Sequence, residues 1–254
     1  MKLKKAVFLD FDGVLFDTVK EAFAVCLLAT GRSSRPEEID YATEDYRIFR
    51  KLRYLIGPAW NYLYLLKVTE EAKTSNIANP EDRYLDYIAQ AKAPDYKDFE
   101  ESFFSARESL KRKHEDLWLK LNSPYGFLFS LENLVKKYPG NFFIVTTKDT
   151  ETVLKLLNFH GLDFSRKNIY GKESLERFKT KQRVISNIMD EYSIDDAIFV
   201  DDNKLYLSSC SGLAGVKVLQ SEWGYIPPGD ETGQSLDILS LITELLEGAK
   251  TCMG

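Results

Sequence analysis

This chain of 254 residues has few cysteines and no excess of positive charge. Its three cysteines, Cys26, Cys210 and Cys252, are too few and too scattered to form a disulfide framework or a zinc site. The formal net charge is -5, with 39 acidic against 34 basic residues, so no excess of positive charge indicates a polyanionic partner. We therefore expect a protein of the reducing cytoplasm that binds no nucleic acid.

Long apolar runs are also absent, although 44% of the residues are hydrophobic. No stretch approaches the roughly 20 uninterrupted apolar residues that span a bilayer. The first residues imitate a signal peptide, because lysines precede the apolar run from Ala6 to Leu9, but Asp10 and Asp12 end that run too early. We therefore expect neither membrane insertion nor export.

Short apolar runs that end in polar residues indicate parallel strands buried on both faces. They span residues 6–9, 142–145 and 197–200, and a fourth strand is predicted at 216–219. Segments with helical periodicity lie between these strands. The alternation predicts an α/β fold with a doubly wound, Rossmann-like parallel sheet, whose ligands bind at the carboxyl ends of the strands.

Residues 18–123 interrupt this alternation. They contain no convincing strand, many aromatic residues and helix-period apolar runs such as the one through Phe49, Leu52 and Ile56. Because the sheet pattern begins before this block and resumes after it, we expect an all-α cap domain inserted into an α/β core. The core would comprise residues 1–17 and 124–254, and the insertion would serve as a lid.

Two carboxylates follow the first predicted strand, in the segment Asp10-Phe-Asp12-Gly-Val. Ionised carboxylates beside a core are costly unless they meet a cation or hydrogen-bond donors, so a bound metal ion would account for both. The alternative is a pair of solvated acids in an Asp-Gly turn at the strand end. The spacing alone leaves both interpretations open.

This segment resembles the first motif of the haloacid dehalogenase superfamily, Asp-x-Asp-Gly-(Val/Thr) after a buried strand. The second family motif is a Thr or Ser at the end of the next core strand. Thr146 is similar to it, in the run Phe142-Phe-Ile-Val-Thr-Thr147. A Thr at a strand end is a weak signal alone. The match is strengthened because Thr146 follows the first motif in the order that the family shows.

The third and fourth family motifs also have counterparts. The Lys of the third motif is matched best by Lys181, because Thr180 can cap the helix that follows, and Lys179 is the alternative. The fourth motif resembles the pair Asp201-Asp202 after the third strand, in the Asp-Asp variant of one branch of the family.

One departure from the family pattern concerns the metal site. Many relatives carry another acid four or five residues after the metal ligand, where this chain has Tyr206 and Leu207. The Asp-Asp branch often lacks that acid, and Asp201 is a plausible substitute for it. The departure therefore does not indicate loss of activity.

The resemblance implies a Mg²⁺-dependent phosphatase with a helical cap of the first type. Asp10 would attack phosphorus and form an aspartyl phosphate, and Asp12 would act as general acid and base. The metal would be held by Asp10, by the backbone carbonyl of Asp12 and by Asp202, with Asp201 in support or exchanging roles with Asp202. The residues assigned to the phosphate oxygens are Thr146, Thr147 and Lys181.

Three alternatives to a phosphatase stay open. A dehalogenase is disfavoured, because a halide leaving group needs no general acid and that branch of the family lacks a carboxylate at the position of Asp12. A sugar phosphomutase would keep all four motifs. A non-catalytic ligand-binding or regulatory relative would keep only the fold. For an enzyme, the expected substrate is a small phosphorylated metabolite, and no oligomeric state is indicated.

Overall fold

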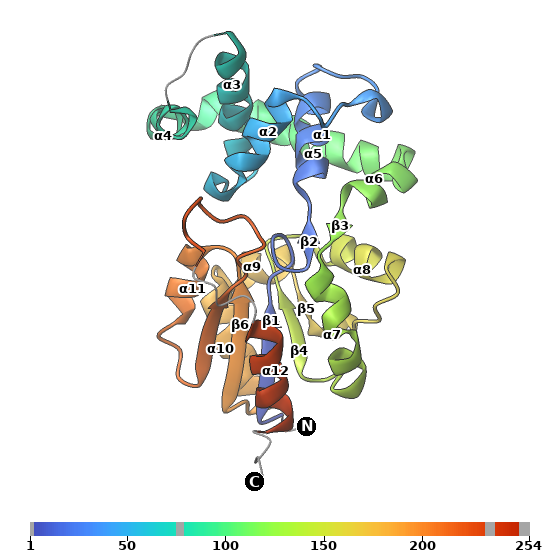
Figure 1. Ribbon diagram of the computed structural model, residues 1–254, viewed down its shortest axis with the longest axis vertical. Helices are drawn as coiled ribbons and strands as arrows, with labels where there is room; N and C mark the ends of the chain where they lie inside the picture. The colour runs from blue at the N-terminus through green and yellow to red at the C-terminus, as the bar shows by residue number, and fades with distance from the viewer. Residues whose placement is uncertain (1–2, 75–78, 232–236, 249–254) are drawn as a thin grey trace. The chain divides into compact units, whose positions relative to one another are not determined.

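The computed structural model describes residues 3–74, 79–231 and 237–248. The chain divides into two compact units, one formed by the residues up to Asp17 with those from Ser123 onward, the other by Thr18–Asn122 (Figure 1). Among the described helices, none combines the length and the apolar character needed to cross a bilayer. Cys26 and Cys210 are free and buried, and Cys252 lies outside the described residues.

The first unit is built on a five-stranded parallel sheet with the order β5-β4-β1-β6-β7. Its strands are β1 (Lys5–Leu9), β4 (Phe142–Val145), β5 (Ile169–Tyr170), β6 (Asp196–Asp201) and β7 (Val216–Gln220). Four of them were predicted from their apolar runs, whereas β5 has only two residues and was not. A separate antiparallel pair, β2 (Phe16–Asp17) and β3 (Ser123–Pro124), leads the chain out of this unit and back into it.

Helices cover both faces of the sheet (Figure 1). They are α7 (Gly126–Lys137), α8 (Thr150–Phe159), α9 (Lys172–Phe178), α10 (Lys181–Tyr192), α11 (Lys204–Cys210) and α12 (Ile238–Glu247), with a 3₁₀ turn η3 (Arg166–Asn168). Helix α12 contacts β1, β6 and α7, whereas α10 contacts β4, α9 and α11. Because side chains alternate along a strand, Phe8 and Phe199 join the core cluster with Ile188 of α10, while Ile198 turns toward α12.

The described part of the second unit contains helices and no strand. Its helices are α1 (Val19–Ala29), α2 (Glu44–Lys51), α3 (Asn61–Thr74), α4 (Pro80–Gln90), α5 (Ala93–Lys113) and α6 (Glu115–Leu121), with 3₁₀ turns η1 (Pro36–Glu38) and η2 (Arg53–Leu55). Aromatic rings form much of its interior, with Tyr62 stacked on Phe49 and on Phe103 at centroid distances of 5.5 and 5.4 Å. The predicted fold class, an α/β parallel-sheet core with an all-α insertion, is confirmed.

A buried ion pair ties α1 to α5 within this second unit. Arg107 donates to both carboxylate oxygens of Glu21, each at 2.6 Å, and the Glu21 side chain is 1% exposed. Such a bidentate arrangement satisfies a carboxylate that burial would otherwise penalise.

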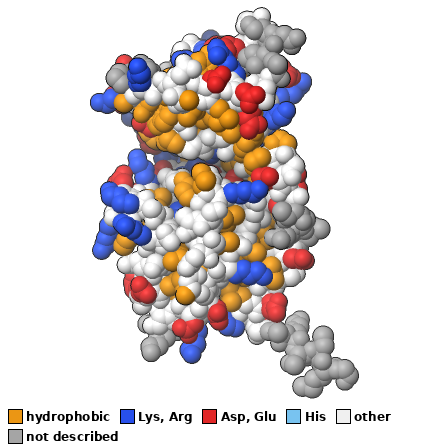
Figure 2. Space-filling model, turned by 90° about the vertical axis from the view of Figure 1, so that its left-hand side faces the viewer, with side chains coloured by type: hydrophobic (Ala, Val, Ile, Leu, Met, Phe, Trp, Pro, Cys, Tyr) orange, Lys and Arg blue, Asp and Glu red, His pale blue; other side chains and the backbone are white. Residues whose placement is uncertain are grey.

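Surface charge is mixed on the face of the molecule shown in Figure 2. Lys and Arg side chains lie among Asp and Glu side chains and hydrophobic groups in that view. On this face the charges are therefore not separated into one basic and one acidic region.

Candidate active site

The carboxyl ends of three neighbouring strands bring the predicted residues together. Asp10 follows β1, Thr146 follows β4 and Asp201 ends β6. Strand β1 pairs in parallel with both β4 and β6, so these three residues lie at one edge of the sheet. All three are buried, with exposures of 7%, 0% and 0%.

Lys181 reaches this edge from the first turn of α10. Thr180 caps the helix, its hydroxyl oxygen accepting a hydrogen bond from the Arg183 amide at 3.2 Å. The Lys181 Nζ lies 2.9 Å from Asp10 Oδ1 and 2.7 Å from Asp201 Oδ2. Burial alone would lower the pKa of Lys181, but the two carboxylates outweigh it and raise that pKa above its ordinary value.

Both carboxylate oxygens of Asp201 are engaged. Oδ2 accepts from Lys181 Nζ, and Oδ1 accepts from the Asn203 amide at 2.9 Å. Burial raises the pKa of the Asp201 carboxyl, an effect that the Lys181 ammonium opposes and the charge of Asp10 increases. Asp201 is thus fixed by the Asn203 amide and in turn positions the Lys181 ammonium.

Asp202 lies against two glycines, Gly13 in the turn after β1 and Gly224 in the loop after β7. Its Oδ2 accepts from the Tyr225 amide at 2.9 Å. A Cβ added to Gly13, which has φ +83°, would stand 2.0 Å from Asp202 Oδ2, and one added to Gly224 would stand 2.2 Å from the Gly13 carbonyl oxygen. Only glycine at both positions allows this approach, so the turn after β1 and the carboxylate of Asp202 are packed together.

The loop after β7 anchors the same turn through hydrogen bonds to its backbone. Ser221 Oγ donates to the Gly13 carbonyl and Trp223 Nε1 donates to the Val14 carbonyl, both at 3.0 Å. The position of the turn that carries the two aspartates is therefore set by residues about 200 positions later in the chain.

Lys148 is a site residue that sequence reasoning missed. Its Nζ lies 3.0 and 3.2 Å from the two carboxylate oxygens of Asp12, and the residue is 6% exposed. Its amide also donates to Thr146 Oγ1 at 3.3 Å. The available signal was its place two residues after Thr146, but a lysine just beyond a strand is normally a solvated charge.

Two of the predicted phosphate-binding candidates lie outside this cluster. Thr147 and Lys179 are exposed, and no hydrogen bond or ion pair joins either one to the buried carboxylates among the described residues. Lys179 ends α9 with φ +73°. Of the two lysines considered for the third motif, the structure brings Lys181 to Asp10.

Sequence searches give no relative: no protein-family model matches the chain, and no curated protein matches it significantly. Solved structures do match. A haloacid dehalogenase-like hydrolase from Streptococcus pneumoniae superimposes with a TM-score of 0.54 at 19% identity, covering 91% of this chain and 89% of that one. A predicted phosphoglycolate phosphatase from Haemophilus somnus gives 0.59 at 18% identity, with coverages of 95% and 99%. A predicted phosphatase from Clostridium acetobutylicum gives 0.56 at 17% identity, with coverages of 97% and 100%.

The chain has the haloacid dehalogenase-like fold. This confirms the fold implied by the motif resemblance. At such low identities the likeness shows the fold alone, so the chemistry must be argued from the residues that this chain places at its sheet edge.

The acidic residues at this edge fit a divalent cation. Asp10, Asp201 and Asp202 each offer a carboxylate oxygen, and these oxygens lie within 4.8 Å of one another. Lys181 stands within ion-pair distance of Asp10 Oδ1 but outside hydrogen-bonding geometry, so that buried oxygen has no hydrogen-bond partner among the described residues. Clustered carboxylate oxygens are ligands that Mg²⁺ prefers. The Lys181 ammonium lies within ion-pair distance of two of the three acids, Asp10 and Asp201.

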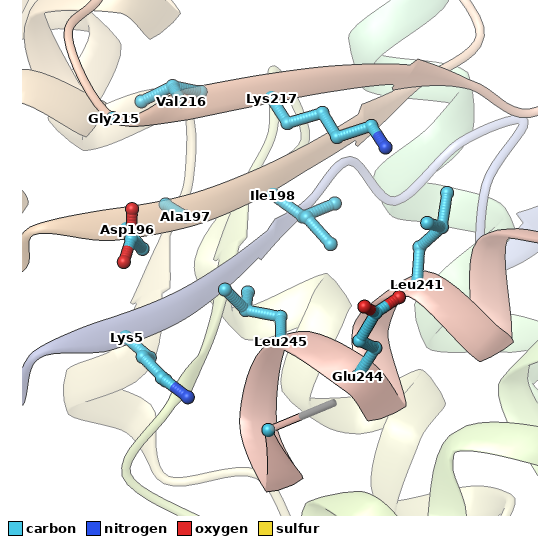
Figure 3. Close-up of a pocket in the computed structure, with 11 residues that line it drawn as sticks. Lys5, Asp196, Ala197, Ile198, Gly215, Val216, Lys217, Leu241, Glu244 and Leu245 are labelled. Carbon is cyan, nitrogen blue, oxygen red and sulfur yellow. The ribbon is translucent and has the colours of Figure 1, made fainter. Parts of the chain in front are cut away.

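A cavity of about 630 Å³ lies at the other end of the sheet. Figure 3 shows Lys5 of β1 and Asp196 of β6 on its wall, with Leu241 and Leu245 of α12 on the other side. These two strand residues begin the strands whose far ends carry Asp10 and Asp201. Five residues of strand span roughly 17 Å, so this cavity is separate from the carboxylate cluster.

Proposed function

We propose that this chain is a phosphatase that hydrolyses a small phosphomonoester with Asp10 as its nucleophile. The observation that carries the proposal is the environment of the Asp10 carboxylate. It is buried beside the Lys181 ammonium, and Oδ1 keeps its lone pairs free of hydrogen bonds from the described residues. A carboxylate so placed is poorly solvated, which favours attack on an electrophile.

The first step forms a bond between an Asp10 oxygen and phosphorus while the bond from phosphorus to the leaving alcohol breaks. Asp12 donates a proton to that leaving oxygen. In the second step Asp12 takes a proton from a water molecule, which attacks the aspartyl phosphate and restores Asp10. Lys148 holds the Asp12 carboxylate through both oxygens, and so fixes its orientation for these transfers.

The phosphate itself requires positive charge and hydrogen-bond donors. Lys181 supplies an ammonium beside the nucleophile, and Thr146, which follows β4, supplies a hydroxyl group. We assign Mg²⁺ to Asp10, Asp202 and the Asp12 carbonyl, with Asp201 supporting Lys181. The ion would neutralise phosphate charge as a Lewis acid.

The helical insertion is the proposed cap. Under this proposal its residues, from Thr18 to Asn122, restrict which small phosphorylated metabolite reaches Asp10. Such an arrangement leaves the chemistry to the α/β unit and the choice of substrate to the helices.

The proposal is tested by measuring phosphate release from p-nitrophenyl phosphate and a panel of phosphorylated metabolites, with and without Mg²⁺. We expect metal-dependent release by the native protein, and its loss in Asp10→Asn. Asp195→Asn is the matched control, because Asp195 is exposed before β6 at the other end of the sheet. Absence of release from every compound would refute the proposal, and transfer to a sugar acceptor in its place would identify a mutase.

A further inference from the structure

Tyr206 of α11 (Lys204–Cys210) lies beside the buried ammonium of Lys181. Its ring is half-buried and packs against the core cluster that includes Ile188 of α10. The Lys181 Nζ lies 4.2 Å from the centroid of that ring. A cation at this distance over an aromatic face is attracted by the negative charge density of the ring, most strongly where water is excluded.

Three groups therefore surround the Lys181 ammonium. Asp10 and Asp201 lie 2.9 and 2.7 Å away, and the ring of Tyr206 covers a further side. Lys181 is 2% exposed, so these neighbours take the place of its hydration shell. The ring differs from the other two because it stabilises the cation without adding a negative charge.

That difference matters for the charge of the whole cluster. The cluster already gathers the carboxyl groups of Asp10, Asp201 and Asp202, whose oxygens lie within 4.8 Å of one another, and Lys181 lies within ion-pair distance of the first two. Burial raises the pKa of the Tyr206 phenol, so the ring stays neutral. A further carboxylate at position 206 would add negative charge where an anionic phosphate has to bind, and the ring avoids this.

We propose that Tyr206 is a positioning residue for Lys181, whose ring holds the ammonium at the site without competing with phosphate for it. This inference rests on the proposed function in taking phosphate as the ligand of Lys181. Acting through Lys181, Tyr206 should affect phosphate binding more than the rate of the chemical steps.

Three variants separate the ring from the hydroxyl and from charge. Tyr206→Phe keeps the ring, Tyr206→Leu removes it, and Tyr206→Asp introduces the acid. Orthophosphate binding is measured by titration calorimetry in the presence of Mg²⁺, and KM and kcat are measured for any substrate found. We expect Tyr206→Phe to match the native protein. Tyr206→Leu should raise Kd and KM about 10-fold with a smaller effect on kcat, and Tyr206→Asp should raise Kd further.

A spectroscopic readout tests the geometry without turnover. With ¹³C-labelled lysine, the Cε protons of Lys181 should be shifted upfield by the ring current in the native protein and in Tyr206→Phe. The shift should disappear in Tyr206→Leu, and Lys181→Met identifies the signal by its loss. Lys67, which lies 5.1 Å from the ring of Tyr64 in the other unit, is an internal reference that should keep its shift in every variant.

The possible failures are distinguishable. If Tyr206→Leu binds phosphate as tightly as the native protein, or if Lys181 shows no ring-current shift, the role of Tyr206 is overturned even when phosphatase activity is present. If no phosphomonoester is hydrolysed but phosphate binding still depends on the ring, the role of Tyr206 stands and the phosphatase proposal fails. A native protein that binds no phosphate would overturn both.

Discussion

The two lysines at the sheet edge, Lys181 and Lys148, form ion pairs in different surroundings. Lys181 and its carboxylate partners are buried, whereas the Asp12 side chain, which pairs with Lys148, is 19% exposed. We connect this difference with function: the more deeply buried groups would bind charge, and the more exposed carboxylate would exchange protons with substrate and water. Each assignment predicts a distinct response to substitution.

Replacement of Lys181 should destabilise the protein and make its stability depend on metal. Lys181→Met leaves Asp10 and Asp201 buried without their counter-ion, and loss of one partner of a buried pair costs about 3–5 kcal/mol. Because a divalent cation can take over part of that role, Mg²⁺ should restore more stability to the variant than to the native protein. Urea unfolding with and without Mg²⁺ measures both effects.

Lys179→Met is the control for this experiment, since Lys179 is exposed two residues away at the end of α9. Its unfolding free energy should stay within about 0.5 kcal/mol of the native value. Equal losses in the two variants would contradict the account of Lys181.

Replacement of Asp12 should separate the two half-reactions. In Asp12→Asn the general acid is lost, so kcat for an alkyl phosphomonoester should fall about 10²- to 10⁴-fold. With p-nitrophenyl phosphate the leaving group needs no proton, and stopped-flow absorbance should show a burst of nitrophenolate close to the enzyme concentration, followed by slow turnover. The same slow phase without a burst would contradict the role of Asp12 in the second step.

At the scale of elements, the parallel strands account for most of what the sequence predicts. Strands β1, β4, β6 and β7 were predicted because buried parallel strands read as continuous apolar runs. Strand β5, with two residues, gives no such run. The contacts of Gly13 and Lys148 were missed for a different reason, since their partners Asp202 and Asp12 lie far away in sequence and no local pattern encodes them.

The turn after β1 gives a prediction for Gly13. In Gly13→Ala the added methyl group would meet the Asp202 carboxylate. The alanine would also have to adopt the positive φ that Gly13 has, which is unfavourable for any residue with a side chain. Gly161→Ala is the control. Gly161 also has a positive φ, +76°, but a Cβ added there meets nothing within 4 Å. Both variants should lose about 1–2 kcal/mol of stability from the backbone alone.

Only Gly13→Ala should lose further stability and bind Mg²⁺ more weakly, because only this substitution displaces Asp202. Titration calorimetry with Mg²⁺ compares the two variants. Equal metal affinities in both would show that the packing of Gly13 against Asp202 has no part in the metal site.

On the scale of the whole molecule, each of the two units has its own core and its own buried ion pair. In the helical unit this is Glu21 with Arg107, and in the α/β unit it is Lys181 with Asp10 and Asp201. Each unit therefore has internal interactions that resist its opening independently of the other.

Loss of the helical ion pair should loosen one unit selectively. Arg107→Leu leaves the Glu21 carboxylate buried without its partner, at a cost of about 3–5 kcal/mol. Hydrogen exchange should then show reduced protection in α1 and α5 with little change in β1 and β6. Arg83→Leu is the matched control, because its ion pair with Glu71 is exposed at 43% and 32%. Loss of protection in β1 equal to that in α1 would contradict independent cores.

The central claim is that Asp10 becomes phosphorylated during turnover. The most direct measurement is mass spectrometry of acid-quenched protein after mixing with a substrate and Mg²⁺, followed by mapping of the modified peptide. We predict one added phosphoryl group on Asp10 in the native protein, more of it in Asp12→Asn, and none in Asp10→Asn. Phosphate release that persists in Asp10→Asn, or a phosphoryl group found on another residue, would contradict the account.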